Sequence, residues 1–223
     1  MSNASFTRDE VILTLDVLYS SGDDRLSKSS PAISDLCNIL QTLPIHSEVN
    51  RPENFRNTDG VSDQIRSFRQ EVSGFKGTRW AVGKIFHEVA KEFQGRTNEL
   101  HEIAVAIRRN KAFFNDFSFG HSEENIGFPE GALLSHLHRV IERRDSIRLS
   151  KEKRCAICKI SMERIYNNCN DSLDFHLLIP VVQLDASKRY LPENFVTVCP
   201  NCHAALHQYR PWRVRENMND ILR

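Results

Sequence analysis

Two pairs of cysteines near the C-terminal end constrain the fold more than any other feature of this sequence. Cys155 and Cys158 form one C-x-x-C pair, Cys199 and Cys202 form another, and 40 residues separate the two pairs. Two such knuckles can place four thiolates around a zinc ion, which stabilises a small module that lacks a large core. We therefore expect a structural zinc site with four cysteine ligands. The two other cysteines, Cys37 and Cys169, are interpreted as buried apolar thiols.

The composition is that of an ordinary globular protein. A chain of 223 residues, 40% hydrophobic and 26% charged, is long enough for one large or two modest domains. The net charge is only +1, so any nucleic-acid surface has to come from local clustering. We find no apolar run long enough for a membrane span and no signal-peptide core. With the C-x-x-C pairs, this favours a cytoplasmic protein that does not contact membranes.

The first half of the sequence has the pattern of helices. Thr7 and Glu10 form a capping box before an apolar stripe, and Ser30 followed by Pro31 begins a second helix. Helical spacing of apolar residues recurs over 61–68, 79–93 and 99–109. We predict a helical domain over residues 1–110 and, because residues 111–128 show no clean period, a linker there.

A basic segment follows the predicted linker. Residues 129–149 have a helical pattern, and from Arg139 to Arg154 there are seven basic residues against three acidic ones. This segment either faces the phosphates of a nucleic acid, with Arg143 and Arg144 as candidate contacts, or is a solvated helix face. The sequence leaves both interpretations open.

Three histidines lie within the frame of the two cysteine pairs. His203 and His207 are four residues apart and share one face of a predicted helix, while His176 lies in the β-rich stretch "LDFHLLIPV". Imidazoles from two elements can hold a metal between them. Alternatively, His203 and His207 are polar residues on a zinc-ribbon helix.

This C-terminal segment resembles the HNH, or ββα-metal, nuclease family in its cysteine-knuckle branch. The resemblance rests on the two C-x-x-C pairs, a strand with His176 followed by Pro180, Asn194 on a loop, and the pattern C-P-x-C-H-x-x-x-H. It implies an α+β protein in which a mainly helical N-terminal domain precedes a small HNH domain over residues 129–223. The resemblance also implies that His176, His203 and His207 bind a catalytic divalent metal such as Mg²⁺, Mn²⁺ or Ni²⁺, and that Asn194 braces the loop holding the general base.

The second strand histidine of that family, its general base, falls on Leu177 of this chain. Leucine cannot take a proton, and a missing general base costs about a hundred- to ten-thousand-fold in rate. Three interpretations stay open: a degenerate nuclease that still binds DNA and zinc, a nuclease with another base, or a leucine in place of a natural histidine. The candidates for another base are Asp174, His121, His136 and His138.

The N-terminal half resembles the helical domain of modified-cytosine-dependent, McrA-like restriction endonucleases. The resemblance rests on the opening helix, on "LQTLPIH" and on "FRNTDGVSDQIRSFR". It implies recognition of methylated or otherwise modified double-stranded DNA, and a role in restriction or defence. Arg56 and Arg69 are candidates for phosphate or guanine contacts, and Asn57 either reads an adenine edge or caps a helix.

Aromatic residues of the N-terminal half allow two interpretations. Phe55 and Trp80 could stack on a base taken out of the duplex, or they belong to the core.

Three hypotheses of function follow. The first is a divalent-metal-dependent DNA endonuclease acting on modified DNA, and relatives of this kind often act as homodimers. The second is a DNA-binding protein of HNH fold that reads modified DNA without cutting it. The third is a zinc-ribbon interaction protein, which predicts no salt-dependent binding to DNA. The sequence does not specify the modified base, its flanking bases or the catalytic metal.

Overall fold

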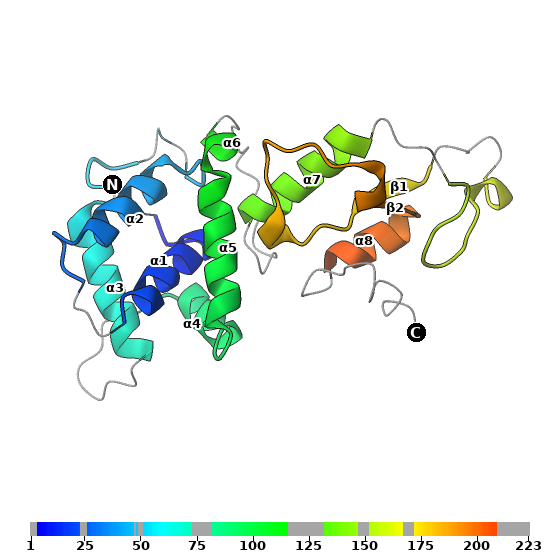
Figure 1. Cartoon of the computed structure of the whole chain (residues 1–223). Helices are drawn as coiled ribbons and strands as arrows, with labels where there is room; N and C mark the ends of the chain where they lie inside the picture. Colours follow the sequence, from blue (N-terminus) through cyan, green and yellow to red (C-terminus); the bar gives the residue numbers. More distant parts are fainter. Residues whose placement is uncertain are drawn as a thin grey trace. The chain divides into compact units, whose positions relative to one another are not determined.

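The computed structural model describes residues 4–22, 26–46, 48, 51–72, 82–115, 132–146, 152–166 and 172–208. The chain forms two compact units, Met1–Leu133 (unit 1) and Leu134–Arg223 (unit 2). Figure 1 labels their helices and strands. In the part of the chain that is described, no helix is long and apolar enough to cross a membrane.

Unit 1 is built from helices around α1. Its helices are α1 (Arg8–Ser20), α2 (Pro31–Thr42), α3 (Thr58–Val72), α4 (Lys84–Glu92), α5 (Thr97–Arg109) and the short α6 (Lys111–Asn115). Helix α1 packs against α2, α3, α4 and α5 (Figure 1), which explains why its apolar residues are buried on more than one side. In the core, the rings of Phe68 and Phe86 stack with their centroids 3.9 Å apart.

The ends of these helices follow the local sequence signals. Ser30 is the N-cap of α2 with Pro31 at its first turn, and Glu10 accepts a hydrogen bond from the backbone N–H of Thr7 over 2.8 Å. Gly95, with φ of 73°, separates α4 from α5 in the left-handed conformation that glycine adopts readily.

The predicted linker differs in its first residues. Residues 111–115 form α6, and Phe114 is fully buried, so burial of this ring stabilises a helical turn that the periodicity did not indicate. The remainder of that range, 116–128, lies outside the described residues.

Unit 2 contains a two-stranded sheet followed by a helix. Strands β1 (Asp174–Leu177) and β2 (Phe195–Val198) are antiparallel, with His176 opposite Val196 and Leu177 opposite Phe195. Helix α8 (Pro200–Gln208) begins directly after β2 and packs on β1, and α7 (Ala132–Ser146) precedes the first cysteine pair. Three short 3₁₀ helices lie at Met162–Arg164, Val181–Gln183 and Pro192–Asn194.

One buried apolar cluster of unit 2 includes cysteines. Leu173, Leu178, Val198 and Leu206 are buried together with Cys155, Ile157, Cys199 and Cys202. The predicted fold class is confirmed: a mainly helical N-terminal region precedes a small two-stranded sheet, a following helix and a four-cysteine cluster.

Candidate metal centres

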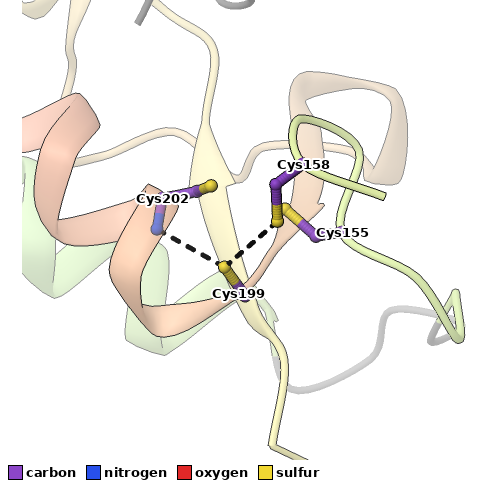
Figure 2. A group of neighbouring side chains, drawn as sticks. All are labelled: Cys155, Cys158, Cys199 and Cys202. Carbon is purple, nitrogen blue, oxygen red and sulfur yellow. Dashed lines mark hydrogen bonds between the residues drawn. The ribbon is translucent and has the colours of Figure 1, made fainter. Parts of the chain in front are cut away.

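Unit 2 brings the four predicted cysteines together. The sulfur atoms of Cys155, Cys158, Cys199 and Cys202 all lie within 4.8 Å of one another, and Figure 2 shows the four side chains turned toward a common point. Cys158 Sγ and Cys199 Sγ are 3.7 Å apart. This donor set, closed on all sides by thiols, suits a structural zinc ion.

Backbone hydrogen bonds hold the first knuckle in place. Cys155 N–H donates to Ile160 O over 2.9 Å, and Lys159 N–H donates to Cys155 O over 3.0 Å. Lys159 adopts φ of 60° to complete this turn. Ala156 N–H then donates to Thr197 O over 2.9 Å, which attaches the knuckle to β2, the strand that leads into the second cysteine pair.

The pKa values of Cys155, Cys158 and Cys202 are shifted in different directions. Burial raises the pKa of Cys202 and Cys158, whereas at Cys155 the backbone amides that face the sulfur outweigh burial and lower the pKa. A divalent cation among the four sulfurs would favour the thiolate form of each.

A second group of metal-type ligands lies on three elements of unit 2. It consists of Glu142 from α7, His176 from β1, and His203 and His207 from α8, with one ligand atom from each residue within 4.8 Å of the others. Three of the four were predicted from the sequence, and the structure brings these three together. Because His203 and His207 are one helical turn apart, both rings face the same side of α8.

Glu142 is the central residue of this group. Its Oε1 lies 3.0 Å from His176 Nδ1, and its Oε2 lies 3.3 Å from both His203 Nε2 and His207 Nε2. The side chain is only 5% exposed. Burial raises the pKa of Glu142, but the neighbouring histidines outweigh it and hold the pKa well below its usual value. A buried carboxylate anion therefore faces four imidazoles, because His138 Nδ1 also lies 3.5 Å from Glu142 Oε1.

The imidazoles respond to the same carboxylate in different ways. Burial dominates at His176 and lowers its pKa, although Glu142 opposes this effect. At His203, Glu142 and Asp174 outweigh burial and raise the pKa.

Asp174 contacts the ring nitrogen of His203 that points away from Glu142. Its Oδ2 is 3.2 Å from His203 Nδ1, while the opposite ring nitrogen, Nε2, faces Glu142. A carboxylate on the second nitrogen of a ligand histidine fixes the ring orientation and tautomer. Since Asp174 lies two residues before His176 on β1, one strand supplies both a ligand and the support of another ligand.

His138 lies against this group from α7. Its Nε2 is 3.1 Å from the carbonyl oxygen of Leu177, which only accepts, so Nε2 carries the proton. Burial lowers the pKa of His138 to about 3, and the ring is fully buried. His138 is therefore a neutral, interior imidazole at neutral pH.

Leu177, the residue after His176 on β1, is 1% exposed. Its backbone N–H donates to Glu142 Oε1 over 2.9 Å. The main chain of Leu177 thus fixes the central carboxylate, and its side chain offers no proton acceptor.

Asn194 makes the contacts of a loop brace. Its Oδ1 accepts from Leu191 N–H over 2.9 Å, and its carbonyl oxygen accepts from Leu178 N–H over 2.8 Å. The second bond joins the loop before β2 to the residue that follows Leu177.

The two arginines predicted on α7 have different surroundings. Arg143 is exposed. Arg144 donates to both carboxylate oxygens of Asp145, over 2.9 and 3.0 Å, and to the carbonyl oxygens of Ala186 and Lys188. Its guanidinium therefore ties α7 to the loop before Tyr190, and a contact with DNA would require these bonds to open.

Arg56 is part of the interior of unit 1. It is 4% exposed and donates to the two carboxylate oxygens of Glu10 over 2.7 and 3.0 Å, and to the carbonyls of Ala4 and Ser5. The predicted contact of Arg56 with DNA would require this buried ion pair to open. Phe55, 6% exposed and beside the Arg56 guanidinium, belongs to the core.

The other candidates from the sequence are distributed as follows. Asn57 Oδ1 accepts from Gly60 N–H over 2.9 Å, so the capping interpretation is confirmed. Arg69 is half-buried and lines a pocket on α3 with Lys28 and Arg66. Cys37 is buried, as predicted. Trp80, His121 and Cys169 lie outside the described residues.

Glu142 is the site residue that the sequence reasoning missed. In the sequence it is one of three acidic residues within the basic segment from Arg139 to Arg154. The available signal was its spacing of four from His138, which places both on one face of a helix, but the element that this face meets is distant in sequence.

Comparisons with known proteins give no further guide. Neither the family models, nor the curated proteins, nor the solved structures include a match to this chain.

Proposed function

We propose that the chain is a divalent-metal-dependent DNA endonuclease of the HNH type. The observation that carries this proposal is the convergence of His176, His203 and His207 from one strand and the next helix. The four-cysteine cluster lies at the start of that same helix. The family that the sequence resembles uses this ligand order for the cleavage of phosphodiesters.

The residues present fit a metal ion. Imidazole nitrogens and a carboxylate are ligands of zinc and of related divalent ions. When bound, such an ion would polarise a phosphodiester and stabilise the leaving oxygen. Asp174 orients the ring of His203, and Asn194 fixes the loop beside Leu177, so the chain holds these side chains in place before any substrate arrives.

The weak point of the proposed enzyme is proton transfer. Leu177 has no basic atom, and His138, which lies nearby, is fully buried and donates its Nε2 proton to Leu177 O. We therefore expect slow cleavage, about a hundred- to ten-thousand-fold below that of a homologous site with a histidine at position 177.

An exposed edge of α7 supplies the proposed contact with phosphates. Arg139 and Arg143 are exposed and one helical turn apart. At 3.6 residues per turn they lie roughly 60° and 100° around the helix from Glu142, next to the face that meets the metal-ligand group. Double-stranded DNA, with modified bases selected by unit 1, is the proposed partner, and a homodimer would allow both strands to be cut.

Cleavage of supercoiled plasmid, methylated or unmethylated, with Mg²⁺, Mn²⁺, Ni²⁺ or Co²⁺ tests this function. We expect slow, metal-dependent nicking by the wild-type chain, faster nicking by Leu177→His by about 100-fold or more, and none by His203→Ala. Preference for methylated plasmid would support the assignment of unit 1. Absence of nicking by both the wild-type chain and Leu177→His would contradict the proposal.

A second function, DNA binding without cleavage, is favoured by one observation. Position 177 is both apolar and 1% exposed, so it belongs to the interior of unit 2 rather than to an accessible site. This function predicts salt-dependent binding to DNA with no nicking under any metal. Arg139→Gln and Arg143→Gln should each reduce the slope of log affinity against log salt by about 1. Lys153→Gln, which removes an exposed cation outside α7, is the matched control for these two variants.

A further inference from the structure

We propose that Glu142 is the fourth protein ligand of a zinc ion at the centre formed by His176, His203 and His207, and that the resting centre is therefore closed. The family resemblance implies the three imidazoles alone, and the carboxylate comes from α7, outside the sheet-and-helix motif. This inference rests on the metal site of the proposed function, but it does not depend on cleavage of DNA.

The spacing of the ligand atoms carries the inference. The separations are 3.0 Å from Glu142 Oε1 to His176 Nδ1, 3.3 Å from Oε2 to His203 Nε2 and to His207 Nε2, and 3.0 Å between the two Nε2 atoms. Ligands about 2.0–2.1 Å from a tetrahedral zinc ion are about 3.3–3.4 Å from one another. The distances from Glu142 involve both of its oxygens, and one ligand atom from each of the four residues lies within 4.8 Å of the others, so the group is compact enough to hold one metal ion.

Burial excludes a role for Glu142 as a surface charge. Its side chain is 5% exposed, and its contacts in the described residues are imidazoles and the Leu177 N–H rather than an arginine or lysine. A carboxylate anion buried in this way is normally paired with a cation or bound to a metal. Three nitrogens and one oxygen in a compact set suit zinc, whereas Mg²⁺ prefers an octahedral set of oxygens.

A fourth protein ligand changes what the centre can do. Catalytic zinc sites keep three protein ligands and leave one position for water or substrate, while sites with four protein ligands are closed. Glu142 occupies that fourth position here. A phosphate oxygen can reach the ion only by displacing Glu142 or by adding a fifth ligand, so Glu142 controls access to the metal.

Cobalt substitution in the whole chain tests this directly. One equivalent of zinc first fills the four-cysteine site, and Co²⁺ is then added to occupy the Glu142–histidine site. The visible absorption of Co²⁺ is several-fold stronger with four ligands than with five or six. Glu142→Gln is the test variant, and Asp145→Asn, a carboxylate one turn further along α7 that binds Arg144 and Arg189 instead, is the matched control.

We expect a strong four-coordinate spectrum for the wild-type chain and for Asp145→Asn, unchanged by inorganic phosphate. Glu142→Gln should lose most of this intensity, bind the second zinc at least about 100-fold more weakly, and change its spectrum when phosphate is added. A weak wild-type spectrum that phosphate shifts as in Glu142→Gln would overturn the inference while leaving the metal site in place. Failure of the wild-type chain to bind the second metal would overturn both this inference and the proposed function.

Discussion

At the scale of single residues, each unit contains a buried glutamate whose partners are basic side chains. Glu10 in unit 1 and Glu142 in unit 2 are 0% and 5% exposed. Glu10 meets Arg56 and His46, whereas Glu142 meets histidines. The partners decide the role, because a guanidinium neutralises its carboxylate permanently, whereas imidazoles together with a carboxylate are ligands that a metal ion can bind.

The ion pair of unit 1 predicts a large effect of mutation. Arg56→Ala should lower the free energy of unfolding by about 3–5 kcal/mol, because it leaves Glu10 charged and buried without its partner. Urea unfolding followed by circular dichroism measures this change. The double variant Glu10→Leu/Arg56→Met removes both charges and should be far less destabilised, and equal losses in the two variants would contradict this account.

The same pair predicts how stability depends on pH. Burial raises the pKa of Glu10, but His46 and Arg56 outweigh burial and keep the pKa below its usual 4.5. A carboxyl group whose pKa is lower in the folded state stabilises the protein above its unfolded pKa and loses this effect as pH falls through the folded pKa. Unit 1 should therefore lose stability below about pH 4.5, and more steeply than the double variant does. Parallel pH profiles would count against this assignment.

Asp174 is the residue on which the orientation of His203 depends. Asp174→Asn should weaken metal binding at the histidine centre by about 10- to 100-fold, as the loss of an outer-layer partner commonly does. Competition with a chromophoric chelator measures the affinity. The control is Glu163→Gln, which makes the same acid-to-amide change in an ion pair with Lys153. An unchanged metal affinity in Asp174→Asn would show that Asp174 does not support the site.

At the scale of elements, features set by neighbouring residues could be predicted from the sequence, whereas contacts between distant segments could not. The Ser30–Pro31 start of α2 and the pairing of His203 with His207 are written within a few residues, and the structure has both. The contact of Glu142 with His176 and that of Arg56 with Glu10 each join residues 34 or more positions apart. Their roles depend on tertiary packing, which helical periodicity does not encode. Helix α6 was likewise not indicated by helical periodicity, and its Phe114 is buried in the folded chain.

Helix α3 offers a test of a local signal. Asn57→Ala should destabilise unit 1 by about 1 kcal/mol, because the Gly60 N–H loses the side-chain oxygen that caps it. Thermal unfolding measures the loss, and Asn57→Asp, which keeps an acceptor oxygen, should retain most of the stability. A loss as large in Asn57→Asp as in Asn57→Ala would mean that the cap contributes nothing.

At the scale of the whole molecule, the two units have different sources of stability. Unit 1 has a core of large apolar side chains on several helices, whereas unit 2 has a short sheet and a buried cluster in which cysteines take part. Small modules with four clustered cysteines commonly need a bound metal to fold, and we expect the same of unit 2.

Removal of zinc should therefore affect one unit and spare the other. A strong chelator should expose unit 2 to proteolysis and leave the helices of unit 1 protected, and added zinc should reverse the change. Hydrogen exchange read by mass spectrometry reports both units at once. Equal protection of unit 2 with and without zinc would show that its fold does not need the metal.

We propose that unit 2 holds two metal ions, one among four thiols and one among Glu142 and three imidazoles. Native mass spectrometry of the zinc-loaded chain counts them directly. We predict two zinc ions for the wild-type chain and one for His203→Ala, which keeps the four-cysteine site. A single ion in the wild-type chain, unchanged by His203→Ala, would show that the histidine centre is not a metal site and would contradict the account.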